Sequence, residues 1–208
     1  KLWRRQPDEF YSRVIKFCLL YEGLIGSTIL HDEGWQFVQA GKFLERADKT
    51  SRILDMLSGA GSKASRNDML SVLRSSSALT AFRVEFRGDI TLSNVVSFLL
   101  YSPSFPRSAR FCLQQVDRAL HTLTGSPMGT YVNEVERLTG QLVAHINYAG
   151  IEDVWARGLH DYLDDFQSRL NEIGQQVFET YVLLPLEYHD PSWTQLPAAP
   201  WQQQQQQQ

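Results

Sequence analysis

The sequence has few of the features that mark membrane, secreted and metal-binding proteins. No apolar stretch approaches the roughly 20 residues that a membrane span needs, because Gly23 to Leu30 is too short and Glu22 interrupts the run before it. The two cysteines, Cys18 and Cys112, each lie in an apolar run, where a free cysteine is expected to be buried. They provide neither a disulfide framework nor zinc-ligand spacing. These absences predict a chain that does not enter a membrane and that fits a reducing, cytoplasmic compartment.

The motifs of well-known catalytic and cofactor sites are also missing. The chain has no Gly-x-x-x-x-Gly-Lys phosphate loop, no Gly-x-Ser-x-Gly nucleophile turn and no Cys-x-x-Cys pair. Two i,i+4 pairs, Asp117–His121 and His160–Asp164, each offer two metal ligands, but a metal site needs more than two. Both are therefore interpreted as pairs on a helix surface. We predict no metal and no cofactor.

Charge is unevenly distributed along the 208 residues, although the net charge is only −3. Residues 1–131 hold 17 Lys and Arg against 12 Asp and Glu, whereas residues 132–208 hold 3 against 11. Either the acidic C-terminal helix packs beside the basic part, which we favour, or the two halves face different partners. Acidic residues interleave every basic cluster, so nucleic-acid binding is not expected.

Apolar residues recur at three- and four-residue spacing along almost the whole chain, without strand alternation. This pattern predicts an all-α fold, an antiparallel bundle of about six or seven helices with short connections. Residues 1–184 are expected to form one folded domain, followed by a disordered Pro- and Gln-rich tail over 185–208. The fifth helix is expected to begin at Ser104 and the sixth at Ser126. The expected helices span residues 8–30, 32–57, 65–88, 89 or 91 to 102, 104–125, 126–150 and 151–183.

The most informative segment is the charged helix expected over residues 32–57. Glu45–Lys49 and Asp48–Arg52 are i,i+4 pairs with the acid first, which is the favourable order. A solvated face with ion pairs is therefore favoured over a binding face, although both remain open. Arg46 lies at the margin of the apolar face, where it either reaches outward or is buried against a carboxylate. The apolar face itself is formed by Phe37, Ala40, Phe43, Leu44, Ala47 and Leu54.

Arg107 and Arg110 fall in the first turns of the fifth expected helix. The helix dipole disfavours cations at that end, so the two arginines call for a negative partner. That partner is either internal, with Glu45 or Asp48 as the candidates, or a bound carboxylate or phosphate. We favour the internal ion pair and keep anion binding as the alternative.

The segment Phe43-Leu44-Glu45-Arg46-Ala47-Asp48, with Thr50 and Arg52, resembles the Glu-Arg motif helix of the alpha-E domain family, a predicted all-helical domain. The similarity covers roughly residues 10–183. Members of the family usually carry a further N-terminal region with its own Glu-Arg helix. Because that region is absent and the first residue is Lys1, we expect a fragment that represents the C-terminal part of the family domain. Further similar blocks are Ser77-Ala78 through Phe82, Phe98-Leu99-Leu100, Phe105 to Ser108, Phe111-Cys112-Leu113 and Gly158 to Leu163.

The resemblance implies a companion of ATP-grasp peptide ligases and transglutaminase-like proteins in peptide synthesis or modification. We therefore expect a helical accessory module without activity of its own, which binds such a protein partner. Its Glu45, Arg46, Asp48, Arg52 and Arg107 would form an ion network or part of the docking surface. The alternative is an enzyme subunit in which Glu45 is a general base and Arg46 or Arg107 binds a carboxylate or phosphate. A bundle without its N-terminal part would expose an apolar face that a second copy could cover, giving a homo-oligomer.

Overall fold

The computed structural model describes residues 2–59 and 64–183, and within these ranges the chain is helical and contains no strand. The all-α prediction is confirmed, while the tail expected over 185–208 lies outside the described residues. None of the helices in these ranges is long and apolar enough to cross a membrane. The elements are α1 (Leu2–Arg5), α2 (Pro7–Thr28), α3 (Glu33–Asp55), α4 (Arg66–Ser75), α5 (Leu79–Glu85), α6 (Leu92–Tyr101), α7 (Ala109–Thr124), α8 (Glu134–Tyr148), α9 (Ile151–Arg157), α10 (Leu159–Phe178) and a π-helical turn, η2 (Glu179–Leu183).

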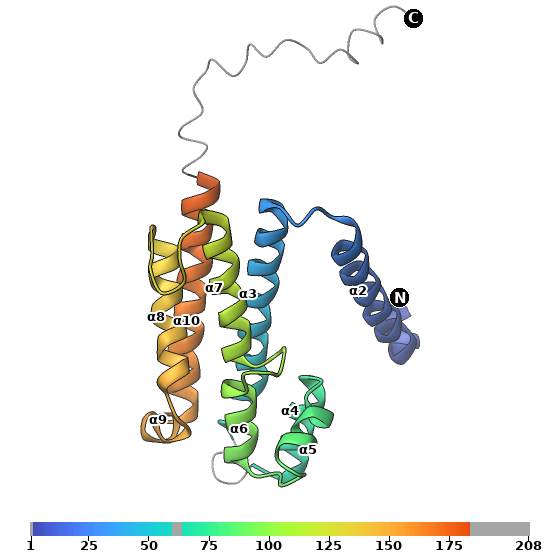
Figure 1. Ribbon diagram of the computed structural model, residues 1–208. Helices are drawn as coiled ribbons and strands as arrows, with labels where there is room; N and C mark the ends of the chain where they lie inside the picture. The colour runs from blue at the N-terminus through green and yellow to red at the C-terminus, as the bar shows by residue number, and fades with distance from the viewer. Residues whose placement is uncertain (1, 60–63, 184–208) are drawn as a thin grey trace, which may run out of the picture.

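Four long helices, α3, α7, α8 and α10, form an up-and-down bundle (Figure 1). Helix α3 packs along α7, α7 packs along α8, and α10 contacts both α3 and α8. Helix α6 lies below α7, with α4 and α5 beside it (Figure 1). The apolar stripes of these helices meet in one continuous core. Its fully buried members include Ala47, Leu54, Leu99, Leu113, Leu120, Ile146 and Leu163.

Side-chain caps determine where several helices begin. Asp32 accepts a hydrogen bond from the Trp35 amide at the start of α3, at 3.3 Å. Ser65 and Asp68 form a reciprocal capping box on α4. Each cap provides an acceptor for a backbone N–H that has no partner within the helix.

Two helix starts differ from the sequence-based expectation. Helix α7 begins at Ala109 rather than near Ser104, because Ser108 is the cap: its Oγ accepts from the Phe111 amide at 3.1 Å and donates to the Ser102 carbonyl at 2.5 Å. Helix α8 begins at Glu134 rather than at Ser126, with Asn133 as its cap. The segment 126–133 is therefore a loop on the face formed by α7 and α8.

Two expected single helices are each broken by a residue with a positive φ angle. Ser77, at φ 55°, separates α4 from α5. The amides of Ser77 and Ala78 bond to the last free carbonyls of α4, an arrangement that ends a helix. Gly158, at φ 92°, separates α9 from α10, and only glycine adopts this conformation without a steric cost.

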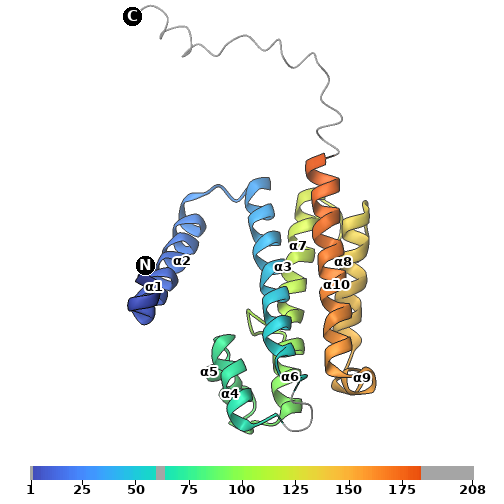
Figure 2. The ribbon, with the colours of Figure 1, turned by 180° about the vertical axis from the view of Figure 1, so that it is seen from behind.

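Helix α2 lies beside the bundle, outside its core (Figure 2). None of its residues is buried, and the side chains of Phe17 and Leu19 are 67% and 65% exposed. Cys18 is exposed as well, which corrects the expectation that both cysteines are internal; Cys112 is buried as expected. The chain thus folds as a bundle from α3 to α10, with an additional apolar helix on one side of α3.

Candidate functional site

The charged face of α3 is a chain of ion pairs at the protein surface. Both expected i,i+4 pairs form: Arg52 Nε lies 2.9 Å from Asp48, and Lys49 Nζ lies 3.3 Å from Glu45. Lys49 also contacts Asp48, at 3.1 Å. Partial burial of Asp48 works against its ionisation, but the hydrogen bonds from Arg52 and Lys49 prevail and lower its pKa. Glu45 is exposed and has only Lys49 as its ion-pair partner among the described residues, so this face is a solvated surface.

Arg46, the arginine of the Glu-Arg pair, reaches across to α2. Its Nη2 lies 3.0 Å from Glu22 Oε1, and Lys42 Nζ donates to the same oxygen at 3.2 Å. Both cations also lie over the ring of Phe43, with Lys42 at 4.8 Å and Arg46 at 5.4 Å from its centre. Of the two alternatives for Arg46, the structure has the one in which the side chain is largely buried against a carboxylate.

A groove of about 280 Å³ surrounds this ion pair, between α2 and α3. Most of its wall is apolar, and the carboxylate of Glu22 is already shared by two cations. The side chains that line the groove therefore connect α2 to α3, and Glu22 is not available as a free acid or base. Its lining residues are Phe17, Cys18, Tyr21, Glu22, Ile25, Trp35, Val38, Gln39, Lys42 and Arg46.

The ion pairs of Glu22 with Lys42 and Arg46, which connect α2 to α3, are expected to weaken at acid pH. Partial burial opposes ionisation of Glu22, but the contacts with Lys42 and Arg46 lower its pKa below the ordinary 4.5. Because the pKa of Glu22 is lower in the folded chain than in the unfolded chain, the contact stabilises the fold at pH values above the unfolded-state pKa. This stabilisation is lost as the pH falls through the folded-state pKa. The distance between α2 and α3 should thus stay unchanged from pH about 8 to about 5 and become heterogeneous only below the ordinary glutamate pKa.

Spin labels at Lys16→Cys and Met56→Cys, in a Cys18→Ser background, would measure that distance by electron paramagnetic resonance. Burial, opposed only by the charges of Arg46 and Arg107, raises the pKa of the Cys112 thiol to about 12, so this cysteine is expected to stay unlabelled. Glu22→Gln should give the heterogeneous distribution at every pH. A narrow distribution in Glu22→Gln would show that apolar contacts alone hold α2.

The structure does not bring Arg107 to Glu45 or Asp48. Arg107 precedes α7 and is exposed, and its backbone carbonyl accepts a hydrogen bond from Thr50 Oγ1 at 2.8 Å. Its backbone therefore forms a hydrogen bond to α3. Arg110, in the first turn of α7, is half-buried, and its Nε has no hydrogen-bond partner in the part of the chain that the structure describes. The expected internal ion pair is not formed, and anion binding by the two arginines remains a prediction.

The pair Asp117 and His121 is buried inside the protein, which corrects its interpretation as a surface pair. Asp117 is 6% exposed and His121 is 5% exposed. They lie on the side of α7 that faces α8 and the loop 126–133, so the neighbouring elements cover them. Their carboxylate and ring atoms, Oδ1 and Nδ1, are 3.5 Å apart.

Glu136 is a buried acid that the sequence reasoning did not single out. It is 1% exposed and accepts hydrogen bonds from Thr124 Oγ1, Ser126 Oγ and the Val132 amide, at 2.6, 3.1 and 2.9 Å. The signal available in the sequence was the spacing of Asn133 and Glu136, which matches a helix cap followed by an acid in the first turn. Glu136 holds the loop 126–133 onto α7 and α8.

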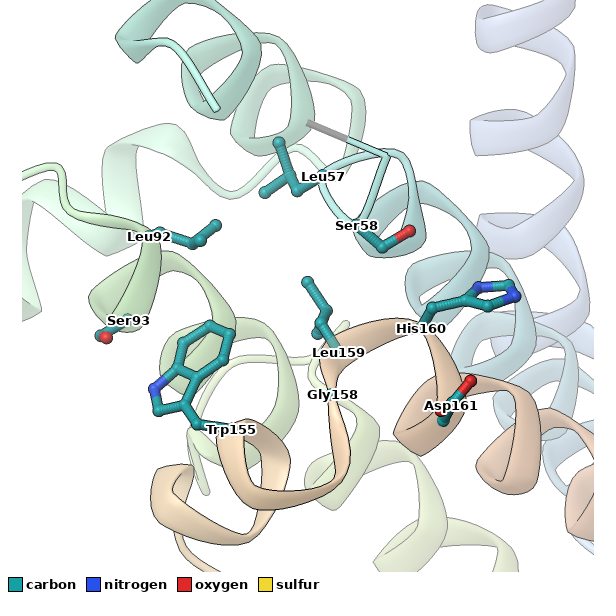
Figure 3. Close-up of a pocket in the computed structure, with 9 residues that line it drawn as sticks. All are labelled: Leu57, Ser58, Leu92, Ser93, Trp155, Gly158, Leu159, His160 and Asp161. Carbon is teal, nitrogen blue, oxygen red and sulfur yellow. The ribbon is translucent and has the colours of Figure 1, made fainter. Parts of the chain in front are cut away.

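A larger cavity, of about 520 Å³, lies where the end of α3 meets the first turns of α6 and α10 (Figure 3). Leu92 and Leu159 point toward its middle, whereas Ser93 and His160 point away from it (Figure 3). The His160 ring instead bonds to Asp55 at 3.0 Å, which raises the pKa of His160. The remaining lining residues are Leu57, Ser58, Trp155, Gly158 and Asp161. The cavity is apolar at its centre and does not assemble a nucleophile with a base.

Fold and site together define a class of protein: an all-helical domain whose Glu-Arg pair lies in a network of ion pairs on one bundle helix. Within the described ranges, no group of three or more His, Cys, Asp or Glu side chains could hold a metal ion. The family whose model matches is Alpha-E, "a predicted alpha-helical domain with a conserved ER motif", and the match covers residues 1–182. The chain therefore belongs to the Alpha-E family. The comparison with curated proteins found no match, and no solved structure matches either.

Proposed function

We propose that this chain is a non-catalytic helical accessory module that acts in the cytoplasm by binding a protein partner. The proposed partner is an ATP-grasp ligase or a transglutaminase-like protein of a peptide-forming or peptide-modifying system. The observation that carries the proposal is helix α2, which presents apolar side chains to solvent on several sides. An exposed apolar surface of this size on a folded protein is typical of a site where another protein binds.

The exposed apolar area of α2 is of the size that a protein interface needs. Eight large side chains of this helix are between 42% and 67% exposed. If each leaves on the order of 100 Å² uncovered, together they offer ~800 Å², the area that one partner contributes to a standard interface. These side chains are Tyr11, Val14, Ile15, Phe17, Leu19, Leu20, Tyr21 and Leu24.

The Glu-Arg pair supports this function by positioning α2. Arg46 is the motif residue that contacts Glu22, so the motif helps to hold the apolar helix against α3. The alternative, an enzyme subunit with Glu45 as general base, needs acid, base and anion-binding groups that converge on one cavity. Glu45 pairs with Lys49 at the surface, Arg46 turns toward α2 and Arg107 is exposed, so no observation favours that alternative.

The proposal predicts that a charge placed on α2 abolishes partner capture. The tagged chain would be used to capture proteins from its host, with ATP-grasp and transglutaminase-like proteins identified by mass spectrometry. Leu20→Glu should lower their recovery roughly tenfold or more, because burying an unpaired carboxylate at the centre of an interface is strongly unfavourable. Leu20 is already 61% exposed, so the variant should fold as the wild type does.

Val84→Glu is the matched control, since Val84 is 80% exposed on α5, away from α2. It should leave the recovery unchanged. Equal recovery with Leu20→Glu would contradict docking through α2, and failure to recover either protein class would contradict the proposed partner. If a second copy covers α2 instead, light scattering will show a dimer that Leu20→Glu dissociates.

A further inference from the structure

Another cavity, of about 690 Å³ and open to solvent on one side, is lined by α7, α8 and the loop between them, on another side of the bundle from α2. Its wall combines two buried acids with tyrosine rings and two glycines. The residues that line it are Asp117, His121, Gly129, Thr130, Tyr131, Glu136, Arg137, Gly140, Gln141, Val143, Ala144, Asn147 and Tyr148. No contact of the ion network on α3 involves these residues.

Asp117 is the unexplained group in this cavity. Its side chain is 8% exposed, and its Oδ1 has no hydrogen-bond donor among the residues that the structure describes. A buried carboxylate oxygen without a donor costs free energy, so such an atom calls for a partner. Rotation about the terminal bond of an aspartate is broad, so either carboxylate oxygen can turn toward a donor in the cavity.

The neighbouring His121 ring is already engaged on both sides. Nδ1 lies 2.8 Å from the Asp117 carbonyl oxygen and Nε2 lies 3.1 Å from the Thr130 carbonyl oxygen. Burial disfavours the charged ring, but these two acceptors outweigh burial and raise the pKa of His121. The ring therefore directs its N–H groups at backbone oxygens and leaves the Asp117 Oδ1 atom at 3.5 Å without a full hydrogen bond.

Two buried acids, Asp117 and Glu136, lie in the cavity wall, and His121 and Arg118 are the cations that act on Asp117. Arg137 is neutralised by Glu134, with which it forms an ion pair. Burial raises the pKa of Asp117, although the charges of His121 and Arg118 act against this, so a cation bound beside Asp117 would favour its ionised form. Tyr131 and Tyr148 lie at the cavity and are largely exposed, so their rings are available to a bound cation.

We propose that this cavity binds a primary ammonium group on an alkyl chain, with Asp117 as the acceptor. The ammonium supplies the donor that Asp117 Oδ1 lacks and places a positive charge beside its carboxylate, and its alkyl chain lies among Val143, Ala144 and the tyrosine rings. A dicarboxylate site for a metal ion does not fit, because no cluster of three ligands is present in the described ranges. A small amine and a lysine side chain share the chemistry that the site recognises.

The test uses Nα-acetyl-lysine N-methylamide as the probe, whose only charge is the side-chain ammonium, and follows backbone amide signals of the full chain by NMR. Saturable shifts are expected at Thr130, Tyr131 and Gly140. Asp117→Asn should weaken binding roughly tenfold or more, because it removes the charge that the ammonium neutralises. The Nε-acetylated probe, of similar shape but neutral, should not bind.

Asp164→Asn is the matched control, an exposed aspartate on α10 that undergoes the same chemical change and should leave binding unchanged. Gly140→Leu gives a test that leaves Asp117 in place. A Cβ at Gly140 would meet no atom within 4 Å, so a side chain can begin there, and a leucine at this position in the cavity wall should also block the probe. Butylammonium, used as a second probe, distinguishes a small amine from a lysine side chain as the ligand. An affinity equal to that of the lysine probe assigns the site to small amines, and a weaker affinity assigns it to lysine. Absence of saturable shifts in the wild type, or unchanged affinity in folded Asp117→Asn, would overturn the proposal.

Discussion

Replacing Phe98 with alanine is expected to destabilise the folded chain by about 4 kcal/mol, the largest effect of a single substitution that we predict. Phe98 is 1% exposed and lies at the centre of an aromatic cluster. Its ring stacks on Phe105 at 4.8 Å and meets the edges of Phe82 and Phe86 at 5.6 and 6.1 Å. The substitution removes the apolar contacts of the ring, the geometry-specific attraction between the rings, and the support that joins α5 to α6.

The measurement is urea unfolding followed by circular dichroism. Val84→Ala removes an apolar side chain from α5 that is 80% exposed, so it should change the free energy of unfolding by less than about 0.5 kcal/mol. A loss below about 1.5 kcal/mol for Phe98→Ala would mean that the neighbouring rings collapse into the space left by the substitution.

The sequence was sufficient to predict the helices of the bundle because each one carries an apolar stripe of helical period. Ala40, Ala47 and Leu54 of the predicted apolar face on α3 are buried in the structure. Helix boundaries were harder to predict when two residues competed for the same role. Ser104 and Ser108 both have the chemistry of a cap, and in the structure it is Ser108 whose Oγ accepts the hydrogen bond from the Phe111 amide.

Contacts between helices were not predictable in the same way. The helical wheel places Arg46 at the edge of the apolar face, but it does not say which neighbour covers that edge. The partner, Glu22, lies in α2, and no local rule links two residues 24 positions apart. Asp117 and His121 show the same limit, because an i,i+4 acid–histidine pair has the same spacing whether it is exposed or buried.

Glu136 is the site of the second large effect: Glu136→Ala is expected to cost about 3 kcal/mol. The substitution removes a side chain that is 1% exposed and leaves the part-buried hydroxyls of Thr124 and Ser126 and the Val132 amide without their shared acceptor. Urea unfolding measures the loss, and hydrogen exchange should show a faster-exchanging Val132 amide. Glu136→Gln keeps an acceptor oxygen and should recover part of the stability.

The neighbouring Glu134 provides the control for Glu136. Glu134 is exposed in the same helical turn, and its one ion-pair partner among the residues that the structure describes is Arg137, so Glu134→Ala should cost far less than Glu136→Ala. A comparison of Glu136→Ala with Asp117→Asn separates two roles of the cavity wall, which are holding the loop 126–133 and binding the ammonium group. Since Glu136 holds the loop that carries Thr130 and Tyr131, Glu136→Ala should weaken ammonium binding and loosen the loop together, whereas Asp117→Asn should weaken binding with the exchange of the Val132 amide unchanged. If Glu136→Ala leaves both stability and loop exchange unchanged, the loop is held by its backbone turns alone, and the acid serves the cavity through its charge.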